Sequence, residues 1–380
     1  MLPIAVFAPK AETLLLLSLT PFLLFSLNKK DLIVSLTRPF WIKALYAIII
    51  YGAISVIWTN EQFDALKLIL SLLILFSLSS ILFYQSGRLD KSAKLFFFNS
   101  ITVGYLLGLI FFFVELFFEF PIFRWVLGLP KSGPNSPDVG ILGPAFSVLM
   151  LMFWPVIFVI WSKNRLLAGS MILLVIILSL NGNNLASFFC FIFSSSIFLI
   201  ARIWGRVFSI LITSLTAIFI LSSPFIASSL NPNVFTENLS DNYRSTLHRL
   251  YIWEFTAEKI SEKPILGWGI DSSRSIPGSD REVLPSGEIL SLHPHNAALQ
   301  IWLELGIIGA SIFSLIIMYL GFSIASISDN YMRATALSTL YSALTFSFLS
   351  FGIWQNWWIS SLILTALFVR ILVTSTHENL

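Results

Sequence analysis

The sequence changes character at Leu292-His-Pro-His-Asn-Ala-Ala-Leu-Gln-Ile-Trp-Leu-Glu-Leu-Gly306, where a long polar segment runs into an apolar one. Two of the four histidines, His293 and His295, lie at this boundary. Pro294 suits the first position of a helix, because its missing N–H would have no partner there. We therefore expect His295 in the first turn of a helix, among free backbone amides that favour negative charge and a neutral imidazole.

The composition of the whole chain indicates a membrane protein. Hydrophobic residues make up 56% of the 380 residues, charged residues make up 11%, and the mean hydropathy is +0.85. Such a chain has lipid rather than water as its main solvent. The net charge of +3 is too small for a nucleic-acid partner, and the single cysteine, Cys190, excludes a disulfide framework.

Apolar runs of about 20 residues, the length that spans a bilayer core as a helix, recur along the chain. The alternating pattern of a membrane barrel is absent, so helices are the expected spanning form. The sequence predicts an all-α polytopic membrane protein of about eleven transmembrane helices, with one large, partly helical loop before the ninth. The runs are 11–28, 40–59, 63–85, 94–118, 140–161, 166–181, 184–201, 206–229, 297–324, 332–351 and 356–375.

Basic residues occupy every second loop between these runs, and the positive-inside rule places such loops in the cytoplasm. The N-terminus and the large loop then lie outside the cytoplasm, and the C-terminus lies inside. We expect no cleaved signal peptide, because the N-terminus lacks a basic n-region. The basic residues that mark these cytoplasmic loops are Lys29, Lys30, Arg38, Arg88, Lys91, Lys94, Lys163, Arg165, Arg202, Arg206 and Arg333.

The large loop holds roughly a third of the charged residues of the chain. A loop of this length usually carries function. Apolar residues at helical spacing predict an amphipathic helix over 242–261, which ends before Pro264, and an irregular segment over 270–291. The chain divides into residues 1–229 with helices one to eight, 230–296 with the loop that carries the site, and 297–380 with helices nine to eleven.

Arginines and a tryptophan share the predicted loop helix. Arg249 and Trp253 lie one turn apart, and an interfacial membrane anchor is one explanation for such a pair. Arg244 favours a second explanation, because a cluster of guanidinium groups outside the membrane suits a diphosphate.

A polar stripe runs along the predicted ninth helix, where Asn296, Gln300 and Glu304 recur every fourth residue. Packing against the bundle interior is one explanation. A functional role is the other, because an intramembrane carboxylate is costly and is functional by default.

Three further patterns have weaker functional interpretations. Zinc at His248, His293 and His295 is not favoured, because the spacing is unlike that of known zinc sites and no cysteine is near. A serine hydrolase is not favoured either, since no loop serine lies in a Gly-x-Ser-x-Gly sequence. The aromatic run Trp354-Gln-Asn-Trp-Trp358 is typical of the outer membrane interface, with stacking on a sugar ring as the alternative.

The order of these parts resembles the O-antigen ligase and polymerase superfamily. The matching sequences are Arg249-x-x-x-Trp253, Pro264-Ile-Leu-Gly-Trp-Gly269, His295-Asn296 and Leu299-Gln300, followed by Glu304-Leu-Gly306. The resemblance implies transfer of an O-antigen-like glycan from undecaprenyl diphosphate to an acceptor sugar hydroxyl, with lipid A-core as the expected acceptor. It also implies a location on the periplasmic side of the bacterial inner membrane, and a reaction without metal or other cofactor.

By the same resemblance, His295 is the catalytic base that deprotonates the acceptor hydroxyl, and Arg249 holds the diphosphate leaving group. A neutral histidine near pH 7 can accept that proton, and a preorganised arginine stabilises the charge that develops on the leaving group. With the base and the leaving group on opposite sides of the anomeric carbon, we predict inversion at that carbon.

One departure from the family pattern concerns the second diphosphate arginine. Family members commonly have it in the helix hairpin where this chain reads Asn181-Gly-Asn-Asn184. Arg244, Arg274 and Arg124 are candidates to replace it. The expected substrate-binding residues are therefore Arg249, Arg244, Arg274, Asn296, Trp253, Glu304 and Asn184.

Other functions fit parts of this pattern. A polymerase that extends one lipid-linked glycan with another, and a protein O-oligosaccharyltransferase, fit the same resemblance. A transporter or a non-catalytic membrane protein is the alternative from a different class. Transporters tend to have internal repeats and charges near the midplane, whereas this chain shows no repeat and gathers its ionisable residues at one face. The sequence therefore favours a glycan transferase.

Overall fold

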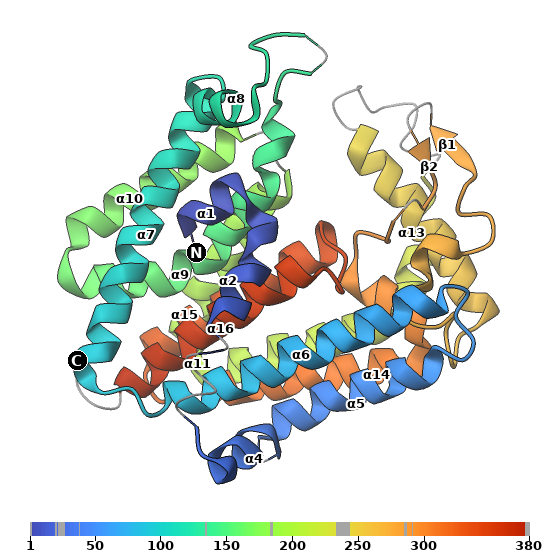
Figure 1. The fold of residues 1–380 in the computed structure, drawn as a ribbon, viewed down its shortest axis with the longest axis horizontal. Coiled ribbons are helices and arrows are strands. Elements are labelled where there is room, and N and C mark those ends of the chain that lie inside the picture. The colour runs from blue at the N-terminus through green and yellow to red at the C-terminus, as the bar shows by residue number, and fades with distance from the viewer. Residues whose placement is uncertain are drawn as a thin grey trace.

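Long helices build most of the molecule, as the computed structural model shows (Figure 1). The structure describes residues 2–19, 21, 27–37, 39–133, 135–182, 185–232, 244–284, 287–290 and 292–376. Before the large loop lie α1 (Leu2–Phe7), η1 (Pro9–Ala11), α2 (Glu12–Ser18), α4 (Lys29–Thr37), α5 (Phe40–Ser55), α6 (Gln62–Ser86), α7 (Lys91–Phe117), α8 (Pro121–Leu127), η2 (Val139–Leu142), α9 (Gly143–Lys163), α10 (Arg165–Asn181) and α11 (Leu185–Ser228). The remainder comprises α13 (Arg244–Glu262), η4 (Ser272–Ser275), β1 (Glu282–Leu284), β2 (Gly287–Glu288), α14 (Ala297–Ala325), α15 (Asn330–Leu349) and α16 (Asn356–Thr376).

The predicted all-α membrane fold is confirmed, but the count of eleven spans is not. Six described helices are long and apolar enough to cross a membrane, or seven if α4 and α5, which meet at 71°, form one span. The difference has identifiable causes. α11 covers two predicted runs and is counted once, α10 has only 17 residues, and α15 carries many polar side chains. The predicted run 11–28 lies partly outside the described residues.

α11 has 44 residues, so a continuous helix would be about 66 Å long, twice the thickness of a bilayer core. Gly205 breaks it with φ 59° and ψ −131°. A β-carbon at Gly205 would approach the Arg333 guanidinium to 2.9 Å, so glycine also makes room for that side chain. The two halves of α11 correspond to the predicted runs 184–201 and 206–229.

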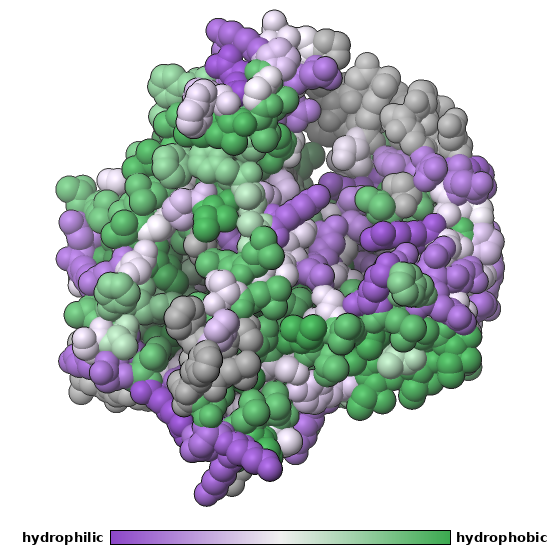
Figure 2. Space-filling model, viewed as in Figure 1, coloured by the Kyte–Doolittle hydropathy of each residue, from purple (hydrophilic) through white to green (hydrophobic). Residues whose placement is uncertain are grey.

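Large apolar side chains lie on the outside of the helix bundle as well as in its core. On α7, Phe96, Val103, Leu107 and Ile110 are exposed at helical spacing. A stripe of large apolar side chains of this kind faces lipid rather than water. Figure 2 shows hydrophobic colour over α5 at the lower right and hydrophilic colour over the large loop above it.

α9 forms the centre of the bundle. Of the most apolar 18-residue stretch of α9, 83% is buried inside the protein, compared with 28% for α7. α9 packs against α1, α7, α15 and α16. The large loop lies at one end, to the right in Figure 1, beyond the ends of α5, α6 and α14. The start of α14 and the turn between α15 and α16 face the loop there, so three segments distant in sequence can contribute to one site.

The amphipathic helix predicted over 242–261 is confirmed as α13, which ends two residues before Pro264. The segment 270–291, predicted to be irregular, instead contains η4 and two short strands among its turns. Within the described residues, sheet structure is limited to β1 and β2, which pair antiparallel.

Candidate functional site

The start of α14 differs from the sequence prediction. Asn296, not Pro294, determines it: the Asn296 side-chain oxygen accepts hydrogen bonds from the backbone N–H groups of Ala298 (3.0 Å) and Leu299 (3.2 Å). Asparagine is among the best N-cap residues because it satisfies these amides. Pro294 and His295 therefore precede the helix, and the prediction that His295 lies in its first turn is wrong. Asn296 caps the helix and is buried.

The His295 ring is held through one nitrogen. Its Nδ1 lies 2.7 Å from the backbone carbonyl oxygen of Ser350. A carbonyl oxygen only accepts, so Nδ1 carries the proton and Nε2 carries the lone pair. Burial lowers the pKa of His295, the hydrogen bond to Ser350 O raises it by a smaller amount, and the positive charge of Arg249 lowers it. His295 thus has the protonation state that a general base requires at neutral pH.

The backbone of His295 is unusual. Its φ is 53°, in the left-handed region that residues other than glycine rarely adopt. The backbone N–H of His295 donates to Nδ1 of His293 at 3.1 Å, and the two imidazole rings lie 4.3 Å apart between centroids. His293 is therefore a close structural partner of His295.

Trp253 fixes α13 against the histidine segment. Its indole Nε1 donates to the backbone carbonyl of Pro294 at 2.9 Å. Trp253 is only partly exposed, so its position reflects this contact rather than that of a free surface anchor.

Arg249 lies one turn before Trp253, whose indole bonds to Pro294 between the two histidines, and the charge of Arg249 lowers the pKa of both His293 and His295. Burial lowers the pKa of the Arg249 guanidinium itself. Arginine nevertheless remains charged in proteins. Among the described residues no hydrogen bond or ion pair of this guanidinium is found. A half-buried, unpaired cation next to the candidate base is suited to an anionic ligand.

Arg274 lies on the same side. Arg274 lies in η4, three residues after the N-cap residue Asp271. Its side chain is exposed, and its charge lowers the pKa of His293. Burial raises the pKa of Asp271, and Arg274 opposes this effect. Arg249 and Arg274, from two different segments, therefore both act on His293 through their charge. The side chain of Arg244 at the start of α13, and Asn184, lie outside what the structure describes.

Glu304 has a different environment from the one predicted. Its carboxylate is fully buried and accepts four hydrogen bonds from protein groups. The donors to Oε1 are Ser273 Oγ (2.5 Å) and Gln300 Nε2 (3.0 Å), and those to Oε2 are the Asp271 backbone N–H (2.8 Å) and Trp354 Nε1 (2.6 Å). Each oxygen has two donors, so we interpret Glu304 as a residue that positions the site, not as one that contacts substrate.

Gln300 extends this network. Its Oε1 accepts from the backbone N–H of Ile353 at 3.0 Å while its Nε2 donates to Glu304. The polar stripe therefore connects α14 to the turn at 350–355, which carries the Ser350 carbonyl that orients His295. The packing interpretation of the stripe accounts for Gln300 and Glu304.

The Pro264-Ile-Leu-Gly-Trp-Gly269 segment fits into a break in α14. At Gly306, φ is 59°, and the helix carbonyls freed there receive new donors. The N–H groups of Trp268 and Gly269 donate to the carbonyls of Leu303 and Glu304, and the N–H of Ile307 donates to Pro264 O, all at 2.9 Å. A β-carbon on Gly267 would overlap the Glu304 backbone, so only glycine allows this approach.

Several contributors to the site were missed or misassigned from sequence. Trp354 and Trp358 are buried inside the protein, so the prediction that this aromatic run marks the membrane interface is wrong for both. Ser350 contributes a backbone carbonyl, which leaves no sequence signal. Ser273 and Asp271 donate to Glu304 across about 30 residues, and a single sequence cannot show such pairing.

No metal set is found around the histidines. The described residues contain no group of three or more His, Cys, Asp or Glu side chains that could hold a metal ion. His248 Nε2 lies 3.0 Å from the carbonyl oxygen of Glu288, so His248 and His295 each direct one ring nitrogen to a carbonyl. Cys190 is buried within α11.

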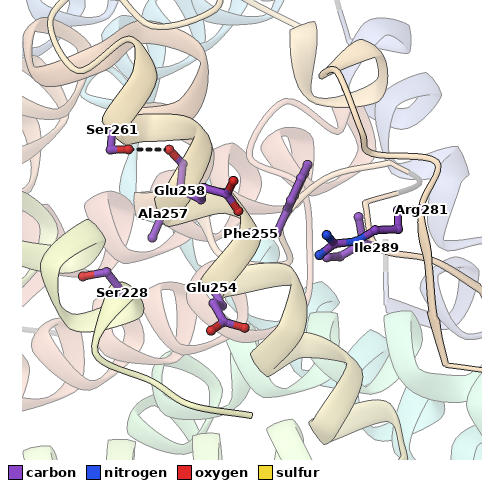
Figure 3. A pocket seen from close by; sticks show the side chains of 8 residues that line it. All are labelled: Ser228, Glu254, Phe255, Ala257, Glu258, Ser261, Arg281 and Ile289. Carbon is purple, nitrogen blue, oxygen red and sulfur yellow. Dashed lines mark hydrogen bonds between the residues drawn. The ribbon is translucent and has the colours of Figure 1, made fainter. Parts of the chain in front are cut away.

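A separate cavity of about 450 Å³ lies on another face of α13 (Figure 3). It opens between α13, the end of α11 and the segment before and after the β1–β2 pair. None of the predicted site residues lines it, so it is distinct from the histidine and arginine cluster. Its lining residues are Ser228, Glu254, Phe255, Ala257, Glu258, Ser261, Arg281 and Ile289.

Comparison with known proteins agrees with these features. A family model described as O-antigen ligase matches residues 142–314, from η2 to the middle of α14. A provisionally named polysaccharide ligase of Rickettsia typhi is 33% identical over 287 residues, covering 72% of this chain and 67% of the relative. Provisionally named polysaccharide ligases of Rickettsia bellii (33% over 281 residues; 72% and 67%) and Rickettsia prowazekii (31% over 302 residues; 76% and 71%) are similar. The chain belongs to the O-antigen ligase family, and it is a multi-pass membrane protein of that family.

Proposed function

We propose that this protein transfers a glycan from undecaprenyl diphosphate to a hydroxyl of an acceptor sugar, with lipid A-core as the acceptor, at the periplasmic face of the bacterial inner membrane. The observation that carries the proposal is the pairing of a half-buried neutral His295, whose Nε2 holds a lone pair, with the nearby Arg249 guanidinium, which has no hydrogen-bond or ion-pair partner among the described residues. A base and an anion-binding cation at one place suit transfer from a diphosphate to a hydroxyl.

The reaction follows from these two groups. His295 Nε2 takes the proton of the acceptor hydroxyl, and the oxygen attacks the anomeric carbon. A bond forms between that oxygen and the carbon, and the bond from the carbon to the diphosphate oxygen breaks. Undecaprenyl diphosphate leaves with the electron pair, while Arg249 and Arg274 stabilise its charge. Attack opposite to the leaving group inverts the anomeric carbon.

The protonated His295 remains stabilised after the transfer. Its Nδ1–H keeps its hydrogen bond to Ser350 O, and the two arginines face the diphosphate rather than an empty site. The described residues supply the base and the cations, so the proposed reaction uses no metal or other cofactor from the protein's side.

The proposal is tested with purified protein, undecaprenyl-diphosphate-linked glycan and lipid A-core. We expect product on the core, a loss of about 10²–10⁴-fold in rate for His295→Ala, and a large loss for Arg249→Ala. Arg281→Ala is the matched control, because it removes the same charge from an exposed position of the same loop. Longer lipid-linked chains instead of core product would identify a polymerase. Wild-type rates for His295→Ala would refute the assigned base.

A further inference from the structure

His293 is the buried histidine that the proposed reaction does not use. Only 8% of it is exposed, and its ring packs against Gly352, where a β-carbon would come within 2.8 Å of His293 Cδ2. Its Nδ1 accepts the hydrogen bond from the backbone N–H of His295. The ring is thus confined on one side by the turn at 350–355 and bonded on another to the candidate base.

This contact bears on an unfavourable backbone conformation at the site, that of His295. A residue other than glycine with φ near 50° costs about 1–2 kcal/mol, and such residues persist when the surroundings determine them. Two hydrogen bonds determine His295: its N–H bonds to His293 Nδ1, and its ring Nδ1–H bonds to Ser350 O. The first fixes the backbone and the second fixes the ring.

The protonation of His293 follows from its partners. Nδ1 accepts an N–H, so in the neutral ring Nε2 carries the proton. The side-chain amide of Gln355 lies 3.3 Å from this Nε2. Because Nε2–H must donate, the amide orientation that satisfies the pair presents the Gln355 oxygen to it. That orientation also gives a partner to the Gln355 Oε1, a buried oxygen that otherwise has none.

We propose that His293 is a positioning residue: as a neutral acceptor held by Gln355, it keeps His295 in the left-handed conformation that presents Nε2 to the acceptor hydroxyl. This inference rests on the proposed role of His295 as the base. Protonation of His293 would place an N–H against the N–H of His295 and abolish the hydrogen bond.

The charges around His293 keep it neutral. Burial lowers its pKa to about 3, and the positive charges of Arg274, of Arg249 and of His295 when that ring is protonated act in the same direction. Gln355, the remaining polar side chain in contact with it, is uncharged. The hydrogen bond to His295 is therefore available throughout the neutral and mildly acidic range.

Three substitutions separate positioning from simple packing. In His293→Asn, the amide oxygen takes the place of Nδ1, so we expect kcat within about threefold of wild type. In His293→Leu, the volume remains but the acceptor is lost, and we expect kcat to fall about 10²-fold with KM unchanged, the scale of loss for a base misplaced by about 1 Å. His293→Gln carries its oxygen one atom further, near the Nε2 position, and we expect it to behave like the leucine variant.

A charge change at Gln355 tests the protonation part. In Gln355→Glu, a carboxylate next to Nε2–H raises the pKa of His293, so the acidic limb of the kcat/KM profile moves to higher pH. The carboxylate also raises the pKa of His295 to some extent. The double variant His293→Asn/Gln355→Glu measures the effect on His295 alone, because asparagine does not titrate. We expect its acidic limb to move by less than that of Gln355→Glu.

The tautomers give a readout that does not depend on activity. With ¹⁵N-labelled histidine, NMR of the whole protein should show His293 protonated at Nε2 and His295 protonated at Nδ1. The chain has four histidines, so His293→Asn and His295→Ala assign the signals.

The outcomes distinguish the two ideas. If His295→Ala is inactive but His293→Leu has wild-type kcat, the positioning role is refuted and the proposed function stands. Equal losses in His293→Asn and His293→Leu would also refute it, because the acceptor atom would then be irrelevant. If His295→Ala is fully active, the proposed function fails. In the NMR experiment, the same tautomer for both histidines would by itself refute the hydrogen-bond arrangement.

Discussion

Replacement of Glu304 by leucine should strongly destabilise the protein. The carboxylate accepts four hydrogen bonds while fully buried, and leucine of similar size accepts none. A buried donor left without a partner costs about 1–3 kcal/mol. Ser273 Oγ can turn to another acceptor, whereas the Asp271 N–H, Trp354 Nε1 and Gln300 Nε2 cannot, which leaves three donors without a partner. We therefore expect Glu304→Leu to lose at least about 3 kcal/mol of unfolding free energy.

Glu304→Gln provides the graded comparison. The glutamine oxygen can face Asp271 N–H and Trp354 Nε1, and its amide nitrogen can donate to the Ser273 hydroxyl. Only Gln300 Nε2 then meets a second donor, because Gln300 Oε1 is already bonded to the Ile353 N–H. One lost donor predicts a cost of about 1–3 kcal/mol.

The measurement is unfolding of the purified protein in mild detergent by added denaturant, followed by tryptophan fluorescence. Glu258→Gln is the matched control, since it changes an exposed carboxylate in the same way and should stay within about 0.5 kcal/mol. The reasoning is refuted if Glu304→Leu unfolds at the same denaturant concentration as wild type, or if Glu304→Gln is the worse of the two.

Four further outcomes follow from the same contacts. Arg249→Lys should retain more activity than Arg249→Ala, because charge is kept while the fork geometry is lost, and steady-state kinetics with the lipid-linked donor measures this. The acidic limb of kcat/KM should lie below pH 6.5, because the folded protein lowers the pKa of His295 and only its neutral form acts; a limb above pH 6.5 would contradict this. Gly306→Ala should lose at least about 2 kcal/mol of unfolding free energy in the same denaturant titration, since it adds a side chain at φ 59° against the Ile265 backbone. The pKa of His293 is about 3 in the folded protein and 6.5 ordinarily, so the unfolded chain binds more protons between pH 3 and pH 6.5. The free energy of unfolding should therefore fall by up to about 1.4 kcal/mol per pH unit as the pH drops through that range. The same titration of His293→Asn should show a less steep fall.

Local patterns predicted the long helix of the large loop, but not η4, β1 or β2. The α13 helix and its end before Pro264 follow from apolar spacing and from the missing proline N–H, both of which act within a few residues. The start of α14 was misplaced because two local signals compete there. Pro294 suits a first helical position, but the Asn296 side chain satisfies two amides and prevails.

The contacts that hold the site together were not predictable in the same way. Glu304 binds Asp271 and Trp354, which lie 33 and 50 residues away in the sequence. Such pairs depend on how α14 and the turn at 350–355 approach each other, and no periodicity encodes that approach. A polar stripe on an apolar helix indicated that partners exist, while their identity required the fold.

The chain has one cysteine, buried in α11, so no disulfide holds the large loop. Hydrogen bonds at the break at Gly306 hold its Pro264–Gly269 segment instead. Unpaired carbonyls in an apolar helix are costly, and the Pro264–Gly269 segment satisfies them with its own N–H groups, so loop and helix each complete the hydrogen bonding of the other. Glu304, in the turn of helix before this break, then ties η4 and Trp354 to the same place. A base in a strained backbone conformation needs such support, because a loop free to relax would release His295 from its left-handed conformation. The broken helix is therefore what allows a loop to hold His295 in place.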